Sequence, residues 1–271
     1  MSLTIAASAI AEAGYRGIEI YADYPHLYPL ETTVETQLEA ARTLDELGLL
    51  AANVNAFTMF RVMDTWRPSY LEIDEEFRAK RLDHTVAALE MAHRIDCPTV
   101  STEPGGQLSS SMTREQGMKM FVNGVKEVLE RTADLDVALL FEPEPGLLVE
   151  NSEHAEVFKL VDDPRFAMNF DAGHFFCVGE DPAKVARDFA GRFDHVHIED
   201  IAADRKHFHL IPGDGAIDFR ALFEALEDIG YDAFVTVELY PHQDDPTSVA
   251  RNAMEYLAPI WKETFGEGRR E

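Results

Sequence analysis

Short runs rich in β-forming residues alternate with longer amphipathic stretches along the whole sequence, and no linker or low-complexity tract interrupts them. A repeated order of strand, helix and strand produces parallel strands joined by right-handed crossovers. The pattern therefore restricts this α/β chain to a doubly wound open sheet or a (β/α)8 barrel. We expect strands at residues 17–21, 49–57, 98–102, 137–142, 166–171, 193–198 and 233–239, with helices such as 4–13, 75–95 and 113–132 outside them.

Polar side chains at the ends of four strands favour the barrel over the open sheet. Glu142, Asp171, His197 and Glu238 each end an otherwise apolar run. A barrel gathers the carboxyl ends of its strands around one mouth, whereas an open sheet spreads them along a line. We therefore predict a single (β/α)8 TIM-barrel domain over residues 1–271.

The first strand of that barrel has no counterpart in the sequence. The chain opens with the predicted helix at 4–13 and passes through Gly14 and Gly17 directly into the first recognisable strand. Either the chain starts late, or its first three residues are vector-derived, or another segment closes the gap. We expect a barrel whose first strand is missing or truncated.

The same four strand-end residues predict a metal site. Three carboxylates and one imidazole form an oxygen-rich ligand set that suits Mn²⁺, Mg²⁺ or Co²⁺ and also accepts Zn²⁺. The alternative is that they are ordinary polar residues at loop mouths. Three converging carboxylates would cost several kcal/mol through repulsion and desolvation without a cation, so we favour the metal.

Further imidazoles follow two of these strands. His174 lies one turn beyond Asp171, where it is placed to touch substrate or a second ion, or has no role. The loop 207–215 is rich in turn residues and is able to swing His207 and His209 over the mouth. No glycine-rich phosphate loop with its lysine accompanies them.

Residues elsewhere near the mouth are expected to orient others or to pack. His195 precedes His197 by two positions, so it faces the same side of its strand one layer deeper, where core packing is the expected role. The early aromatic residues form either a sugar-stacking wall, a dimer contact or plain loop packing. The orienting residues are Glu19, Asn53, Asn55 and Glu103, and the aromatic ones are Tyr24, His26, Tyr28, Trp66 and Tyr70.

The charge balance narrows the range of partners. The 271 residues carry a formal net charge of −26, which disfavours nucleic acids and anionic membranes because both require a basic surface. No apolar run is long enough to span a bilayer and no signal peptide opens the chain, so we expect a cytoplasmic protein. Cys97 and Cys177 form no metal or redox motif. Scarce lysine fits either a salt-adapted cytoplasm or a GC-rich genome.

Several motifs resemble the xylose-isomerase-like TIM-barrel superfamily of metal-dependent sugar isomerases and epimerases, which also contains inosose dehydratases and AP endonucleases. The resemblance implies that Glu142, Asp171, His197 and Glu238 hold one divalent ion, with no organic cofactor. It also implies that Glu142 and Glu238 act as acid and base, and that substrate hydroxyls bind His174, Arg205 and His209. The motifs are Phe141-Glu142-Pro143, residues 169–174, residues 195–200 and residues 209–219.

The chain departs from the AP endonuclease branch of that superfamily. Where that branch holds an additional zinc with histidines, this sequence has Asn55 and Glu103. His207 and His209 lie where the AP endonuclease branch has ligands for its third zinc. A second metal ion in this protein is therefore an open alternative. With the acidic charge, these differences argue against DNA repair.

The expected reaction is proton transfer between two glutamates through an enediolate, in a metal-dependent isomerase or epimerase of a sugar or sugar-like polyol. An inosose-type dehydratase on the same scaffold, or a non-catalytic metal- or sugar-binding subunit, is the alternative. Few basic residues besides Arg205 and Lys206 lie near the mouth, which favours an unphosphorylated substrate. A homo-oligomer is an open alternative to a monomer.

Overall fold

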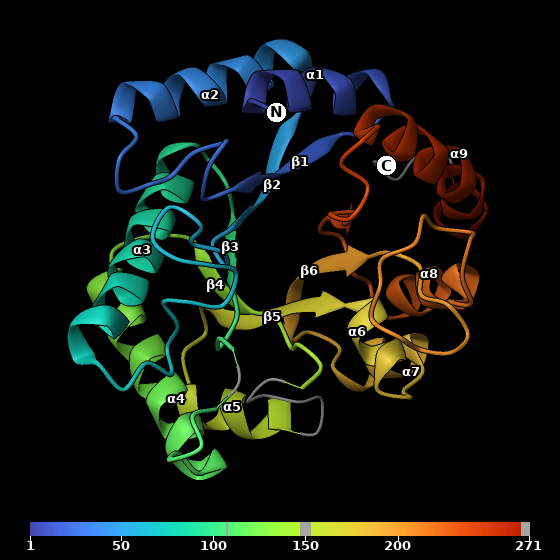
Figure 1. The fold of residues 1–271 in the computed structure, drawn as a ribbon. Helices are drawn as coiled ribbons and strands as arrows, with labels where there is room; N and C mark the ends of the chain where they lie inside the picture. Colours follow the sequence, from blue (N-terminus) through green and yellow to red (C-terminus); the bar gives the residue numbers. More distant parts are fainter. Residues whose placement is uncertain (107, 147–152, 267–271) are drawn as a thin grey trace.

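Seven parallel strands form a nearly closed barrel with helices around it (Figure 1). The computed structural model describes residues 1–106, 108–146 and 153–266. Within them, the strands follow one another in the sheet in the same order as in the sequence. The strands are β1 (Gly17–Tyr21), β2 (Leu50–Asn55), β3 (Thr99–Thr102), β4 (Ala138–Phe141), β5 (Phe166–Asp171), β6 (Phe193–Ile198) and β7 (Val235–Val237).

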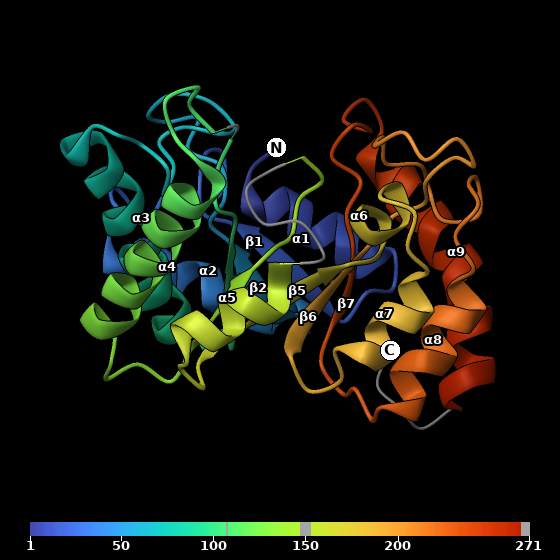
Figure 2. The same cartoon turned by 90° about the horizontal axis from the view of Figure 1, so that it is seen from below.

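Helices connect the strands on the outside of the barrel, as the crossovers of a parallel sheet require. Figure 2 shows the strands crossing the middle of the molecule, with the helices of residues 75–94 and 114–131 on one side and those of residues 182–188, 219–228 and 246–265 on the other. The helices are α1 (Leu3–Glu12), α2 (Val34–Leu47), α3 (Glu75–Arg94), α4 (Arg114–Arg131), α5 (His154–Val161), α6 (Ala172–Cys177), α7 (Pro182–Asp188), α8 (Phe219–Asp228) and α9 (Pro246–Phe265).

Side chains next to the helices define where several of them begin and end. The Thr113 hydroxyl accepts from the Gln116 N–H while the Gln116 side chain accepts from the Thr113 N–H, a capping box that starts α4. Asp74 caps α3 in a similar way by accepting from the Phe77 N–H. Helix α2 ends at Gly48, whose φ of 70° is left-handed and suits glycine. Local sequence thus sets the helix bounds that position the strands.

Aromatic residues fill the space between the sheet and its helices on the side of β4 and β5. Phe141 stacks on Phe166 with ring centroids 5.4 Å apart, and Phe158 and Phe121 approach the Phe141 ring edge-on. All four side chains are buried. This part of the barrel wall is therefore densely packed on its outer face.

The barrel is open between its first and last strands. Among the described residues, β1 pairs only with β2 and β7 only with β6, so no segment adds an eighth strand between them. A cavity of about 980 Å³ lies in this gap, lined by both strands and by α9 residues such as Trp261. Helices α1 and α9 contact each other beside it. The prediction of a TIM barrel lacking its first strand is confirmed.

All seven expected strands are present, and the bounds of β1, β5 and β6 match the predicted ones. The last strand is shorter than the predicted 233–239, since only its three residues Val235–Val237 pair with β6.

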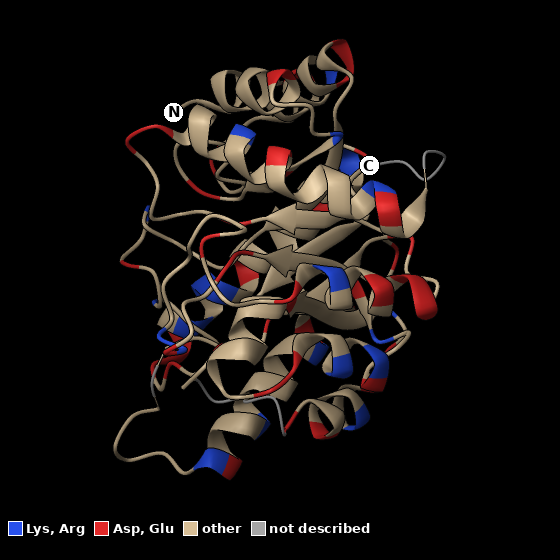
Figure 3. Cartoon of the chain, turned by 90° about the vertical axis from the view of Figure 1, so that its right-hand side faces the viewer, with Lys and Arg blue, Asp and Glu red and all other residues tan. Residues whose placement is uncertain are grey.

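Acidic and basic segments are interspersed over the helices and loops of the side seen in Figure 3. No helix in the described part of the chain combines the length and the apolar character that a membrane span requires.

Candidate metal centre

The four strand-end residues Glu142, Asp171, His197 and Glu238 meet at the mouth of the barrel, and we call them the four-residue cluster. Each offers one ligand atom, and these atoms all lie within 4.8 Å of one another. His197 Nδ1 is 3.4 Å from Glu142 Oε2 and 3.8 Å from Glu238 Oε2. Asp171 in β5 and His197 in β6 are register partners, so their side chains lie at the same level along the barrel axis. The sequence prediction that these residues share one site agrees with this geometry.

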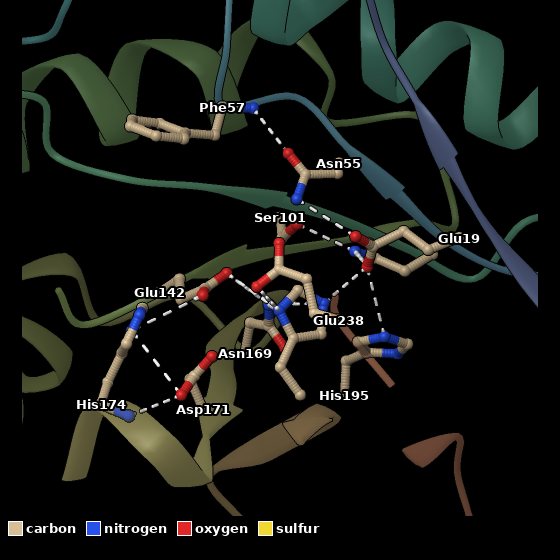
Figure 4. Close-up of polar contacts among 12 residues, drawn as sticks. Glu19, Asn55, Phe57, Ser101, Glu142, Asn169, Asp171, His174, His195 and Glu238 are labelled. Atoms are coloured by element: carbon tan, nitrogen blue, oxygen red, sulfur yellow. Dashed lines mark hydrogen bonds and ion pairs between the residues drawn. The ribbon is translucent and has the colours of Figure 1, made fainter. Parts of the chain in front are cut away.

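The cluster has the chemistry of a divalent-ion site. The described cluster holds three carboxylates, and the Asp171 Oδ2 atom is buried without a hydrogen-bond partner. A buried carboxylate oxygen without a donor costs free energy that a cation at the same point recovers. Asn169 donates its amide to Glu142 Oε2 at 2.6 Å and fixes that carboxylate from the side (Figure 4). The residues present therefore fit a divalent metal.

The carboxyl groups of the cluster differ in their protonation. Burial raises the pKa of Glu238 to about 8, and the charges of Glu142 and Asp171 act in the same direction while His197 opposes them. Burial likewise raises the pKa of Glu142. For Asp171, burial is outweighed by the charges of nearby histidines, which lower its pKa. The site thus contains one firmly ionised carboxylate and two that hold protons more readily.

A second layer of polar contacts lies behind His197. Its Nε2 is 2.7 Å from Glu19 Oε2, and His195 Nε2 is 3.4 Å from the same oxygen (Figure 4). Burial alone would raise the pKa of Glu19, but the charges and hydrogen bonds of the two histidines hold it well below its usual value. The expectation that Glu19 orients another residue fits these contacts. His195 is fully buried, as core packing requires, yet its ring also faces this carboxylate.

A histidine cluster borders the four-residue cluster on the side of α6. His174 Nε2 is 3.1 Å from His207 Nε2, which is 3.0 Å from His209 Nε2. Glu144 lies within 3.3 Å of both His174 and His207. Burial opposes the charge on His174, but Asp171 and Glu144 raise its pKa to about 9. The fold therefore brings His174 and His209 next to the candidate metal ligands.

Asp200 holds the loop that carries His207 and His209. Its carboxylate is buried and accepts four backbone N–H groups, those of Ile201, Gly213, Gly215 and Ile217, at 2.9 to 3.0 Å. His209 is further fixed by the contact of its Nδ1 with the Glu238 carbonyl at 3.0 Å. This loop is therefore pinned to the end of β6 and to the end of β7.

Arg205 does not join the described contacts of these clusters. It is exposed, its guanidinium donates to the Phe176 carbonyl at 2.6 Å, and it stacks over the Phe176 ring at 4.2 Å. Two carboxylates that sequence reasoning passed over do lie close by, Glu144 and the buried Glu199. A Cβ at Gly173 would lie 1.5 Å from Glu199 Oε1, so the absence of a side chain there admits this carboxylate. Glu144 follows Glu142 by two residues, and Glu199 follows His197 by two. An acidic residue two positions after a predicted ligand is the sequence signal that could have identified both carboxylates.

Comparisons with known proteins agree with this architecture. The family model described as "Xylose isomerase-like TIM barrel" matches residues 7–260. A curated relative, inosose dehydratase of Clostridium beijerinckii, is 25% identical over an alignment 282 positions long, which covers 93% of this chain and 87% of the relative.

Solved structures share the fold at lower identity. The structure of IolI protein with a bound zinc atom has a TM-score of 0.79 at 18% identity, covering 98% of this chain and 95% of that one. D-psicose 3-epimerase with D-tagatose, from Clostridium cellulolyticum H10, has a TM-score of 0.77 at 17% identity, covering 96% and 93%.

Proposed function

The chain belongs to the xylose isomerase-like TIM-barrel family, and we propose that it is a divalent-metal-dependent enzyme that removes a proton from the carbon beside a carbonyl in an unphosphorylated polyhydroxy ketone. The observation that carries this proposal is the convergence of three carboxylates and one imidazole within 4.8 Å at the barrel mouth. The zinc named in the IolI structure supports a divalent ion here.

The four-residue cluster would hold the ion through Glu142, Asp171, His197 Nδ1 and Glu238. Such an ion supplies a Lewis acid that polarises the carbonyl and orients the adjacent oxygen of the substrate. Mn²⁺, Mg²⁺, Co²⁺ and Zn²⁺ are all compatible with this ligand set.

Glu142 and Glu238 are proposed as the proton-transfer pair. They follow β4 and β7, which are separated by two strands of the sheet, so they approach the centre of the mouth from different directions. Glu238 would take the proton from carbon, because a carboxylate at the mouth of the barrel is able to gain and lose a proton during turnover. Glu142 would return a proton to the other face of the carbon or to its neighbour.

Two outcomes follow from the same proton removal. Loss of a β-hydroxyl as water gives a dehydratase, and the inosose dehydratase relatives favour this outcome. Return of the proton gives an epimerase or isomerase, and a glutamate on each side of the mouth favours that one. We place dehydration of an inosose-like ketone first, because the inosose dehydratase relatives match at least 90% of the chain at about a quarter identity.

His174 and His209 are proposed to contact substrate hydroxyls, since both border the four-residue cluster. Arg205 would join them only after leaving its contact with Phe176. We also propose that nucleic acids are not substrates, because the net charge of −26 repels a phosphate backbone.

The test is a substrate panel followed by NMR. Purified protein with each of the four metals would be incubated with an inosose, with ketohexoses and with their phosphorylated forms, and Glu238→Gln serves as the control. Dehydration or epimerisation by wild type alone supports the proposal and decides between its two outcomes. Metal binding without turnover of any member indicates the non-catalytic binding subunit, and cleavage of an abasic duplex indicates the DNA-repair branch.

A further inference from the structure

Glu19 contacts His197 on the side of its ring opposite to the candidate metal ligands. His197 Nδ1 faces the carboxylates of Glu142 and Glu238 at 3.4 and 3.8 Å, while Nε2 faces Glu19 Oε2 at 2.7 Å. A neutral imidazole carries one proton, so only one nitrogen has a free lone pair for a metal. The position of the proton therefore decides whether His197 is able to act as a ligand.

We propose that Glu19 is a positioning residue that accepts the Nε2–H of His197 and thereby presents the unprotonated Nδ1 to the metal. The inference rests on the divalent-ion site proposed above and adds a residue from the opposite side of the barrel to it. An ionised acceptor at this distance makes a strong hydrogen bond, which fixes both the tautomer and the ring orientation and raises the basicity of the ligand nitrogen.

The carboxylate of Glu19 is itself held by donors from β2. Asn53 donates to Glu19 Oε2 at 2.8 Å and Asn55 donates to Oε1 at 3.1 Å. Asn53 is oriented in turn, because its Oδ1 accepts from the Thr99 hydroxyl at 2.8 Å and its amide also donates to Ser101 Oγ at 2.8 Å. Glu19 therefore has a fixed side-chain conformation before His197 meets it.

The competing interpretation is a second metal held by Glu19, His195 and His197, whose ligand atoms also lie within 4.8 Å of one another. In that arrangement His197 would bind ions through both ring nitrogens. Its imidazole would then also have to lose the single proton that the neutral ring carries. Asn53 and Asn55 point amide donors at the Glu19 carboxylate, and both of its oxygens are already accepting hydrogen bonds. The contacts therefore favour an acceptor role for Glu19 over a ligand role.

The test compares Glu19→Gln with Glu72→Gln, a matched control. Glu72 is also a glutamate with little exposed surface, but it binds Arg67 in the loop before α3 and has no described contact with the four-residue cluster. Calorimetric titration with Co²⁺ would measure stoichiometry and affinity, the visible spectrum of bound Co²⁺ would report the ligand field, and thermal melting of the metal-free proteins would report folding.

We expect one Co²⁺ per chain in the wild type, an affinity lowered roughly 10- to 100-fold in Glu19→Gln, and a shifted Co²⁺ spectrum in that variant. Glu72→Gln should bind as the wild type does. Unchanged affinity and spectrum in a folded Glu19→Gln variant would overturn the proposal. So would two ions in the wild type with one lost in Glu19→Gln, since Glu19 would then be a ligand.

A second variant keeps the test decisive if Glu19→Gln does not fold. Asn55→Asp is isosteric and still accepts the Phe57 N–H through Oδ1, but it replaces the amide donor to Glu19 with a repelling oxygen. It should weaken Co²⁺ binding in the same direction, and unchanged binding there would also contradict the proposal. Weaker Co²⁺ binding in these variants without turnover of any substrate would support the role of Glu19 and refute only the proposed reaction.

Discussion

The closed side and the open side of the barrel hold their functional residues differently. On the closed side, β5 has six residues that are all buried, and the side chains of Asp171 and His197 are fully buried. On the open side, β7 has three residues that are all partly exposed, and the side chain of Glu238 is 27% exposed. The difference between these two strands accompanies their pairing, since β7 has one partner and β5 has two.

This contrast fits the tasks we propose for Asp171 and His197 on one side and for Glu238 on the other. The proposed ligands Asp171 and His197 are fixed by packing, which suits residues that only bind an ion. Glu238 lines the 980 Å³ cavity and its side chain is less enclosed, which suits a group that also carries a proton. The variants below test this division.

Turnover should depend most strongly on Glu238. In Glu238→Gln, we expect kcat to fall by about 10²- to 10⁴-fold, the range that a general acid or base contributes. Metal affinity should fall less, because Glu238 is the most exposed of the four proposed ligands. Parallel kinetics and calorimetric metal titration would measure both, and a loss of affinity as large as the loss of kcat would remove the distinction between the two sides.

Metal affinity should depend most strongly on Asp171. In Asp171→Asn, we expect affinity to fall by at least about 100-fold, beyond the usual effect of outer-layer changes. The fold should survive, because Asp171 also caps α6 by accepting the His174 N–H and asparagine is an equally good cap. Metal content after dialysis would provide the measurement, and a fully loaded Asp171→Asn variant would refute its role as a ligand.

The sequence predicts the strands, the missing barrel position and the four-residue cluster, because each depends on local pattern or on strand ends. It does not predict which side chains meet across the barrel. The contact between Glu19 and His197 joins residues 178 positions apart, and only the curvature of the sheet brings them together. Arg205 shows the opposite case, since it lies near His207 in sequence but its side chain stacks on Phe176.

Stability should also differ between the two sides. Val196 on β6 and Val235 on β7 are register partners, but Val196 is fully buried and Val235 is partly exposed. We expect Val196→Ala to cost about 2 kcal/mol of unfolding free energy and Val235→Ala less than about 1 kcal/mol. Denaturant titrations of the two variants would compare their losses of unfolding free energy. Equal losses would mean that the gap is filled in solution.

The smallest expected effect is a pH dependence of the metal-free protein. Because the folded-state pKa of Glu238 is raised from 4.5 to about 8, the folded state binds this proton more tightly than the unfolded state. Stability is therefore lost as pH rises from about 5 to about 8, with the melting temperature falling by roughly a few degrees. Glu238→Gln should flatten this slope. A melting temperature that rises over the same range would contradict the assignment.

Solvent deuterium exchange tests the central claim most directly. Glu238 is proposed to take a proton from the carbon beside the carbonyl, so an accepted ketone that carries deuterium at that carbon should lose this label to the solvent when the metal-loaded enzyme turns it over, whether it is dehydrated or epimerised. In Glu238→Gln the exchange should be abolished or confined to one face. Turnover of the same substrate by the wild type with the deuterium fully retained at that carbon would contradict proton transfer and require a different reaction.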